Sequence, residues 1–379
     1  MTPTKQYEKK LITEYNRAKE TLVSRFSMPL EKKEARETLD ATLLLCSTEQ
    51  AKIILKELPA EFQAGLYIES DYLSRKVPMY VTTDFSRISK THLNRITKNT
   101  IGDIGGFNDE LANNLKWKYD GLVMDNELVN SLEKHGWSKN AEKRMLKAGF
   151  DKEVIGLVKH QTTSHKMIQI LETQGIKGGM HPNDVAKLLQ PHIRNVFGKE
   201  GVEISNIGKL RRELMVNAKG EYWWREIKVT RPYHSTVQNY ADVISRSSML
   251  ETHNAGRLES LRESGLVEKY RFICNQTANS CSTCLGMHGL IVDPSDVTPP
   301  IHPRCSCRLA PVWKKSTGLK NHSEKFYSNQ RDTALFKRYK LQEYNKTHET
   351  KLINENFLPP VGEVPKGSEM AAIREAILG

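Results

Sequence analysis

The spacing of the cysteines constrains this chain more than any other feature. Five of its six cysteines fall within one window in the last third of the sequence, from Cys274 to Cys307. That window holds two ligand-like runs, Cys281-Ser282-Thr283-Cys284 and His302-Pro303-Arg304-Cys305-Ser306-Cys307. Two thiols separated by two residues can grip one Zn²⁺ from a tight turn, and a second pair roughly 20 residues later completes a tetrahedron. Disulfide frameworks belong to small secreted chains, so this cluster in a 379-residue chain without a visible secretory signal indicates a metal site.

The predicted ligand set has a firm half and an open half. Cys281 and Cys284 form the first pair, whereas the second pair comes from His302, Cys305 and Cys307. His288 is an outside candidate. A closed site with four protein ligands leaves no position for water, so the predicted zinc is structural and not hydrolytic. The alternatives are reduced thiols packed in a hairpin and a redox pair.

The residues around the cysteines predict a small α+β unit. Alternation and β-branched residues favour strands over 269–274, 289–292 and 308–313, with the first cysteine pair in a knuckle-like β-hairpin between them. A strong helix over 240–263 precedes them, and 221–230 reads as a short strand or as the start of a long helix.

The first part of the chain predicts helices. Apolar residues recur at three- and four-residue spacing in a first helix up to Phe26, and Pro29 opens a second. A cap-like run from Ser47 to Gln50 predicts a third helix that ends near Pro59. Further along, we expect a strand over 80–83 and helices over 86–98, 108–122, 126–132, 138–147 and 151–172. The expected fold class is therefore α+β and mostly α, divided into a helical region 1–165, a domain 166–313 and a basic tail 314–379.

Charge is concentrated near the C-terminal end. The formal net charge is +12, and residues 314–351 alone hold ten basic side chains against four acidic ones. Tyrosines and phenylalanines are interleaved with the basic residues, a combination that suits a nucleic-acid backbone with stacked bases. The candidate DNA-binding residues are Lys314, Lys315, Lys320, Lys325, Arg331, Lys337, Arg338 and Lys340. The competing interpretation is an amphipathic helix docked through its apolar residues, followed by a peripheral arm over 359–379.

One helix and the cysteine runs together resemble a known family. The run from Arg246 to Glu259 contains Asn254-Ala255-Gly256-Arg257, and the two cysteine runs follow it at family-like spacing. This order is similar to the head-morphogenesis domain of tailed-phage minor head proteins, the phage Mu F-like family, over roughly residues 170–313. Arg246, Asn254 and Gly256 carry the helix part of the likeness. The chain departs from the pattern where the family's Arg-Thr-Glu is written Arg246-Ser247-Ser248, which lacks the acidic residue.

The resemblance implies a structural protein and no catalytic activity. Such a protein sits inside the phage head in few copies, after assembly in the host cytoplasm. It associates with the portal or the major capsid protein during head morphogenesis, with DNA as a further candidate partner during packaging or ejection. The alternative functions are a cytoplasmic zinc-containing nucleic-acid-binding protein and, lower in rank, a nuclease. No apolar run reaches the roughly 18 residues that a membrane span needs, so no membrane partner is expected.

Overall fold

A computed structural model describes residues 2–27, 30, 32–77, 88–147, 152–173, 182–204, 208–277, 280–352 and 362–378. Helices dominate, and three small antiparallel sheets are added to them, as expected for a mostly α fold of the α+β class. The strand predicted over 80–83 lies outside the described residues. None of the described helices is both long and apolar enough to cross a bilayer.

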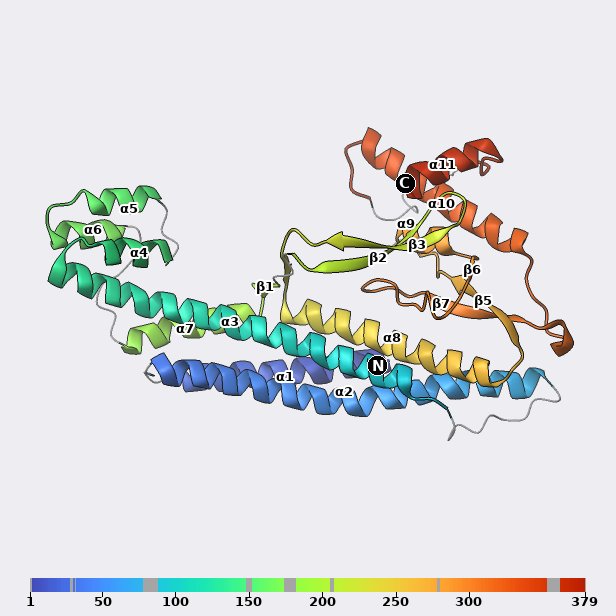
Figure 1. Cartoon of the computed structure of the whole chain (residues 1–379), viewed down its shortest axis with the longest axis horizontal. Coiled ribbons are helices and arrows are strands. Elements are labelled where there is room, and N and C mark those ends of the chain that lie inside the picture. The colour runs from blue at the N-terminus through green and yellow to red at the C-terminus, as the bar shows by residue number, and fades with distance from the viewer. Residues whose placement is uncertain are drawn as a thin grey trace.

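Long helices form the body of the molecule, running along its long axis (Figure 1). They are α1 (Pro3–Arg25), α2 (Lys32–Lys76), α3 (Thr91–His135), α8 (Val237–Glu263) and the shorter α7 (Pro182–Phe197). Their apolar stripes meet in one core, because residues three and four apart share a face of a helix. Helix α8 therefore packs with the N-terminal helices, although it belongs to the later part of the sequence.

Helix α2 is continuous where the sequence predicted an end and a restart. The predicted third helix from Ser47 to about Pro59 was wrong, because α2 runs unbroken through both positions. Ser47 donates its hydroxyl hydrogen to the carbonyl oxygen of Leu43 within the helix instead of capping a new one. A proline inside a helix removes one backbone hydrogen bond, at a cost of about 3 kcal/mol. Burial of Leu58 and Phe62 on either side of Pro59 offsets this loss.

Helix α3 also merges separate predictions. It covers the stretches 108–122 and 126–132, which the sequence divided, and it contains Gly102, Gly105 and Gly106. Three short helices pack at its far end around a core of their own: α4 (Lys139–Lys147), α5 (Lys152–Lys159) and α6 (Ser164–Thr173). The single helix predicted over 151–172 is therefore two helices, α5 and α6.

Two glycines allow α2 and α8 to approach closely. A Cβ atom at Gly256 of α8 would overlap the carbonyl oxygen of Phe62, and one at Gly65 of α2 would overlap that of His253. A hydrogen bond also joins the two helices, with His253 Nδ1 of α8 lying 2.8 Å from Glu61 Oε1 of α2. Gly256, singled out by the family resemblance, thus has a packing reason.

Two antiparallel strand pairs follow α7 and precede α8 in the chain. Strand β1 (Val202–Ile204) pairs with β4 (Tyr233–Ser235), and β2 (Leu210–Val216) pairs with β3 (Tyr222–Lys228) in a long hairpin. The hairpin settles the open choice over 221–230 in favour of a strand. Its end nearest the turn is anchored, because Leu214 and Val216 are buried in a second core that also contains the cysteine window.

The third sheet frames the cysteines. Strand β5 (Val267–Ile273) lies between β6 (Ile291–Val292) and β7 (Arg308–Trp313), all antiparallel. The three strands predicted here are confirmed, with small shifts of their ends. The first cysteine pair is not in a hairpin, however: the short helix α9 (Ser282–Met287) is inserted between β5 and β6 and carries it.

The basic C-terminal segment is folded onto this sheet domain. After a 3₁₀ turn, η2 (Lys315–Thr317), it forms α10 (Glu324–Thr347) and α11 (Ser368–Leu378). Leu335, Phe336 and Leu341 of α10 are buried, as the docked-helix interpretation expects. The last segment is not a peripheral arm, because Met370 of α11 is buried in the second core and the Leu378 side chain lies against Gly286 of α9.

Candidate metal centre

Two segments bring the predicted ligands together. Cys281 is the N-cap of α9, and its Sγ accepts the backbone N–H of Cys284 at 3.3 Å. The second segment is the loop before β7, where the backbone N–H of Cys305 donates to the His302 carbonyl oxygen at 3.1 Å. Arg304 holds this turn with a left-handed φ of 60°. The first segment therefore presents two candidate ligands, and the second presents three: His302, Cys305 and Cys307.

The ligand atoms form two groups that share one cysteine. Cys281, Cys284 and His302 make up the first group, and Cys284, Cys305 and Cys307 the second, with the ligand atoms in each group within 4.8 Å of one another. Within the described part of the chain, these are the two sites where three or more such ligand atoms gather. All five predicted ligand residues thus lie in one place, and Cys284 is at its centre.

Three of the separations between ligand atoms suit a tetrahedral ion. His302 Nε2 lies 3.2 Å from Cys281 Sγ and 3.1 Å from Cys284 Sγ, and Cys284 Sγ lies 3.9 Å from Cys305 Sγ. Zinc bond lengths of about 2.3 Å to sulfur and 2.0–2.1 Å to nitrogen imply tetrahedral edges of about 3.6–3.8 Å. The observed separations match these edges to within about half an ångström.

A backbone contact orients the His302 ring. Its Nδ1 lies 2.8 Å from the carbonyl oxygen of Pro303, which can only accept a hydrogen bond, so Nδ1 carries a proton. Nε2 is therefore the nitrogen that faces the sulfur atoms. Such a hydrogen bond from the non-ligating nitrogen is the usual support of a metal-binding histidine.

Hydrogen bonds within the cluster shift the pKa values of its thiols in opposite directions. A hydrogen bond with Cys284 lowers the pKa of Cys281 to about 4, and His302 adds to the effect. Hydrogen bonds with Cys284 and Cys307 lower the pKa of Cys305 to about 2. The hydrogen bond with Cys281 raises the pKa of His302 to about 9. By contrast, the hydrogen bond with Cys281 raises the pKa of Cys284, and the hydrogen bond with Cys274 raises the pKa of Cys307. Without a metal, the site thus favours thiolates at Cys281 and Cys305 beside an imidazolium, and the thiolate is the metal-binding form of cysteine.

His288, the outside candidate, is engaged elsewhere. It is buried, its Nδ1 accepts the backbone N–H of Cys274 at 3.1 Å, and its Nε2 lies 3.1 Å from Gln330 Oε1. Both nitrogens thus have protein partners, and His288 instead ties β5 to α10. Cys274, which was not among the predicted ligands, is hydrogen-bonded to Cys307, and that contact lowers its pKa to about 7.

The residues of the family-like helix have different surroundings. Asn254 is buried, and its Nδ2 donates to the carbonyl oxygens of Pro299 and Cys307, both at 3.2 Å. It thereby connects α8 to the loop that carries the second ligand pair. Gly256 lies at the crossing with α2, and Arg246 pairs through Nε with Asp242 Oδ1 at 2.8 Å on the exposed side.

The eight candidate DNA-binding residues differ in their burial and in their partners. Lys315, Lys320 and Lys325 are exposed, whereas Arg331 is half-buried and donates to the His288 carbonyl oxygen at 3.4 Å. Lys314 donates to the Gly265 carbonyl oxygen at 2.6 Å, and Lys340 pairs with Glu343 Oε2 at 2.8 Å. Lys337 and Arg338 line a groove beside α10.

The observed arrangement is thus a compact Cys/His cluster, built from the N-terminus of α9 and the loop before β7. The sequence predicted its members, but it offered no signal for the buried contact between Asn254 and the loop of the cluster.

Among known proteins, no family model, no curated protein and no solved structure matches this chain.

Proposed function

We propose that the Cys/His cluster holds one structural Zn²⁺. The thiol-rich donor set and the oriented His302 ring support zinc over metals that prefer oxygen ligands. Cys281 and Cys284 supply the first pair. His302 with Cys305, or Cys305 with Cys307, completes the site. Four protein ligands leave no open position, so the ion stabilises the fold and performs no hydrolysis.

We further propose that the chain is a minor head protein of a tailed phage. It acts in head morphogenesis through contact with the portal or major capsid protein, inside the virion and without enzymatic activity. The observation that carries this proposal is the contact between Asn254 and Cys307. The helix and the cysteine loop that separately bear the family likeness support one another in the fold, as expected if they form one conserved unit of that family.

The test is fractionation of procapsids and virions from cells that express the chain with its neighbouring genes. We expect the chain to sediment with procapsids and with the portal protein. Asn254→Asp should reduce its incorporation, because the substitution replaces the amide donor to Pro299 and Cys307. Lys346→Gln, at an exposed position of α10, serves as the matched control. If the chain never appears in procapsids or virions, the proposal fails.

The second candidate, a zinc-containing nucleic-acid-binding protein, rests on the exposed lysines at positions 315, 320 and 325. Truncation of residues 314–351 would be a poor test, because it would remove the buried Leu335 and Leu341. A triple Lys→Gln variant at the three exposed positions keeps the core intact. If this candidate holds, duplex DNA affinity falls steeply with salt and the triple variant shows a shallower salt dependence.

A further inference from the structure

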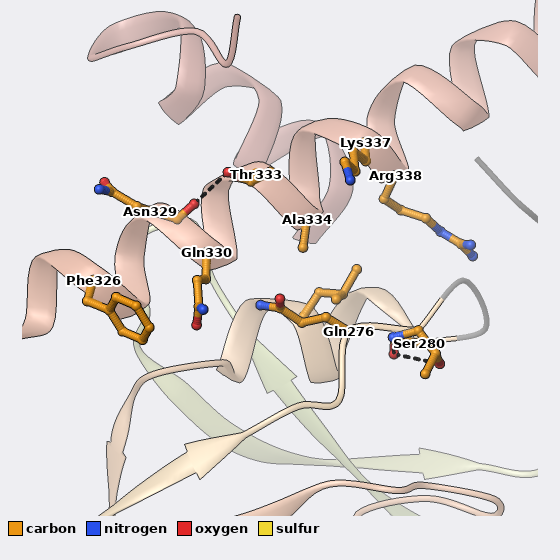
Figure 2. A pocket seen from close by; sticks show the side chains of 11 residues that line it. Gln276, Ser280, Phe326, Asn329, Gln330, Thr333, Ala334, Lys337 and Arg338 are labelled. Carbon is orange, nitrogen blue, oxygen red and sulfur yellow. Dashed lines mark hydrogen bonds between the residues drawn. The ribbon is translucent and has the colours of Figure 1, made fainter. Parts of the chain in front are cut away.

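A groove runs between α10 and the segment that leads into α9. Its volume is about 320 Å³, within the range of small-ligand sites. Figure 2 shows one face of α10 above the groove, with Gln276 and Ser280 on the opposite wall. From Phe326 to Arg338 this face spans thirteen residues, or about 18 Å of helix. The groove is therefore elongated.

Two buried donors in the lining have no partner. Gln276 Nε2 and Arg338 Nε are both inaccessible to solvent, and neither has a hydrogen-bond partner among the described residues. Gln276 is also one of the few non-glycine residues with a left-handed φ, at 51°. Buried donors are nearly always paired in folded proteins, so these two point to an acceptor supplied from outside the chain.

The charge of the lining specifies the kind of acceptor. Lys337 and Arg338 lie at one end, and none of the described lining residues is acidic. Among the described residues, neither cation has an ion-pair partner. The remaining polar lining consists of hydroxyls and amides: Thr277, Ser280, Asn329, Gln330 and Thr333. A fork of arginine donors beside a lysine suits the oxygens of a phosphate.

The other end of the groove offers an aromatic surface. Phe326 lies there, with 40% of the residue exposed, and its ring stacks on His322 at a centroid distance of 4.4 Å. Any nucleic-acid base can stack on an exposed aromatic ring. An acidic peptide has no base to stack there.

We propose that this groove binds a short single-stranded nucleic acid, with a phosphate held by Lys337 and Arg338, a base resting on Phe326, and Gln276 donating to the strand between them. A mononucleotide is too short to reach both ends, because Phe326 and Arg338 are about 18 Å apart along the helix. The proposal rests neither on the phage-head assignment nor on the three exposed lysines, because the groove residues are different ones.

The test measures binding of inorganic phosphate, a nucleoside monophosphate and a labelled hexamer of deoxythymidine to the full chain, by calorimetry and fluorescence anisotropy. Arg338→Gln should weaken all three by about tenfold or more, since a charged hydrogen bond is lost. Lys337→Gln should weaken them less, and its matched control Lys346→Gln should leave binding unchanged. Phe326→Ala should weaken the hexamer but not phosphate or the mononucleotide, because a mononucleotide held by the cations does not reach the ring. The wild-type chain should therefore bind the hexamer more tightly than the mononucleotide.

Gln276→Met separates a loss of binding from a loss of folding. It removes one unpaired buried donor, so it should reduce hexamer affinity without lowering the thermal midpoint of the free protein. The proposal is overturned if none of the three probes binds at millimolar concentration. It is equally overturned if Lys337→Gln and Lys346→Gln weaken binding by the same factor, or if a polyglutamate peptide competes as well as the hexamer does.

Discussion

Asn254 of α8 donates hydrogen bonds to the carbonyl oxygens of Cys307 and Pro299, at 3.2 Å each. One buried amide thus holds both sides of the loop that presents the second half of the Cys/His cluster. The helix is itself fixed against α2, so the long helices position the cluster.

Asn254→Ala should lower the free energy of unfolding by about 2–3 kcal/mol, because two buried carbonyl groups lose their donor. Urea denaturation measures this change, and zinc content should fall as the loop loosens. Glu263→Ala, at an exposed position near the end of the same helix, is the control and should stay within about 0.5 kcal/mol of the wild type. Equal stability of the two variants would show that the contact contributes little.

Cys284→Ser should abolish zinc binding, since Cys284 belongs to both ligand groups. We expect purified wild-type chain to contain about one zinc per chain and the variant roughly a tenth of that or less, by atomic emission analysis. Cys46→Ala is the matched control, because Cys46 is buried in the helical core away from the cluster. A wild-type protein that is purified without chelators and still lacks zinc would contradict the metal assignment.

Gly256→Ala should destabilise the chain by about 1–3 kcal/mol, because the added methyl group would overlap the carbonyl oxygen of Phe62. The same substitution at Gly102, where the added Cβ meets nothing within 4 Å, should instead stabilise α3 by about 0.5–1 kcal/mol. Thermal unfolding of the two variants measures both effects. Shifts of the same sign would refute the close approach of α2 and α8.

His288 should make the chain sensitive to acid. Burial lowers its pKa below the ordinary value of 6.5, so the neutral ring is favoured in the folded state. Its contribution to stability is therefore complete above pH 6.5 and is lost as the pH falls through the lower folded pKa. Across that window the free energy of unfolding should drop by up to about 1.4 kcal/mol per pH unit more in wild type than in His288→Gln.

This comparison needs a control for the other titrating groups. His348→Gln changes an exposed histidine at the end of α10, so its pH dependence should follow that of wild type. If His288→Gln and His348→Gln show the same slope between pH 6.5 and 4.5, the buried histidine does not govern acid stability.

The N-terminal helices illustrate what local patterns leave undecided. Pro59 and the cap-like run at Ser47 are genuine local signals for ends, yet α2 passes through both. Its buried face is continuous across them, and packing against α1, α3 and α8 outweighs a local cost of a few kcal/mol. Helix α3 likewise continues through Gly102, Gly105 and Gly106, although glycine disfavours a helix interior.

What the sequence by itself determined is the chemistry of the cluster: its thiol and imidazole ligands come from two short runs whose internal spacing sets which atoms can meet. It also determined the strands beside them and the helix α8, because each has a clear local period. Only the tertiary structure decided that α8 packs with the N-terminal helices, that Asn254 reaches the cysteine loop, and that α10 and α11 complete the second core. These contacts join residues far apart in the chain, and their energies depend on burial and shape, which no local pattern records.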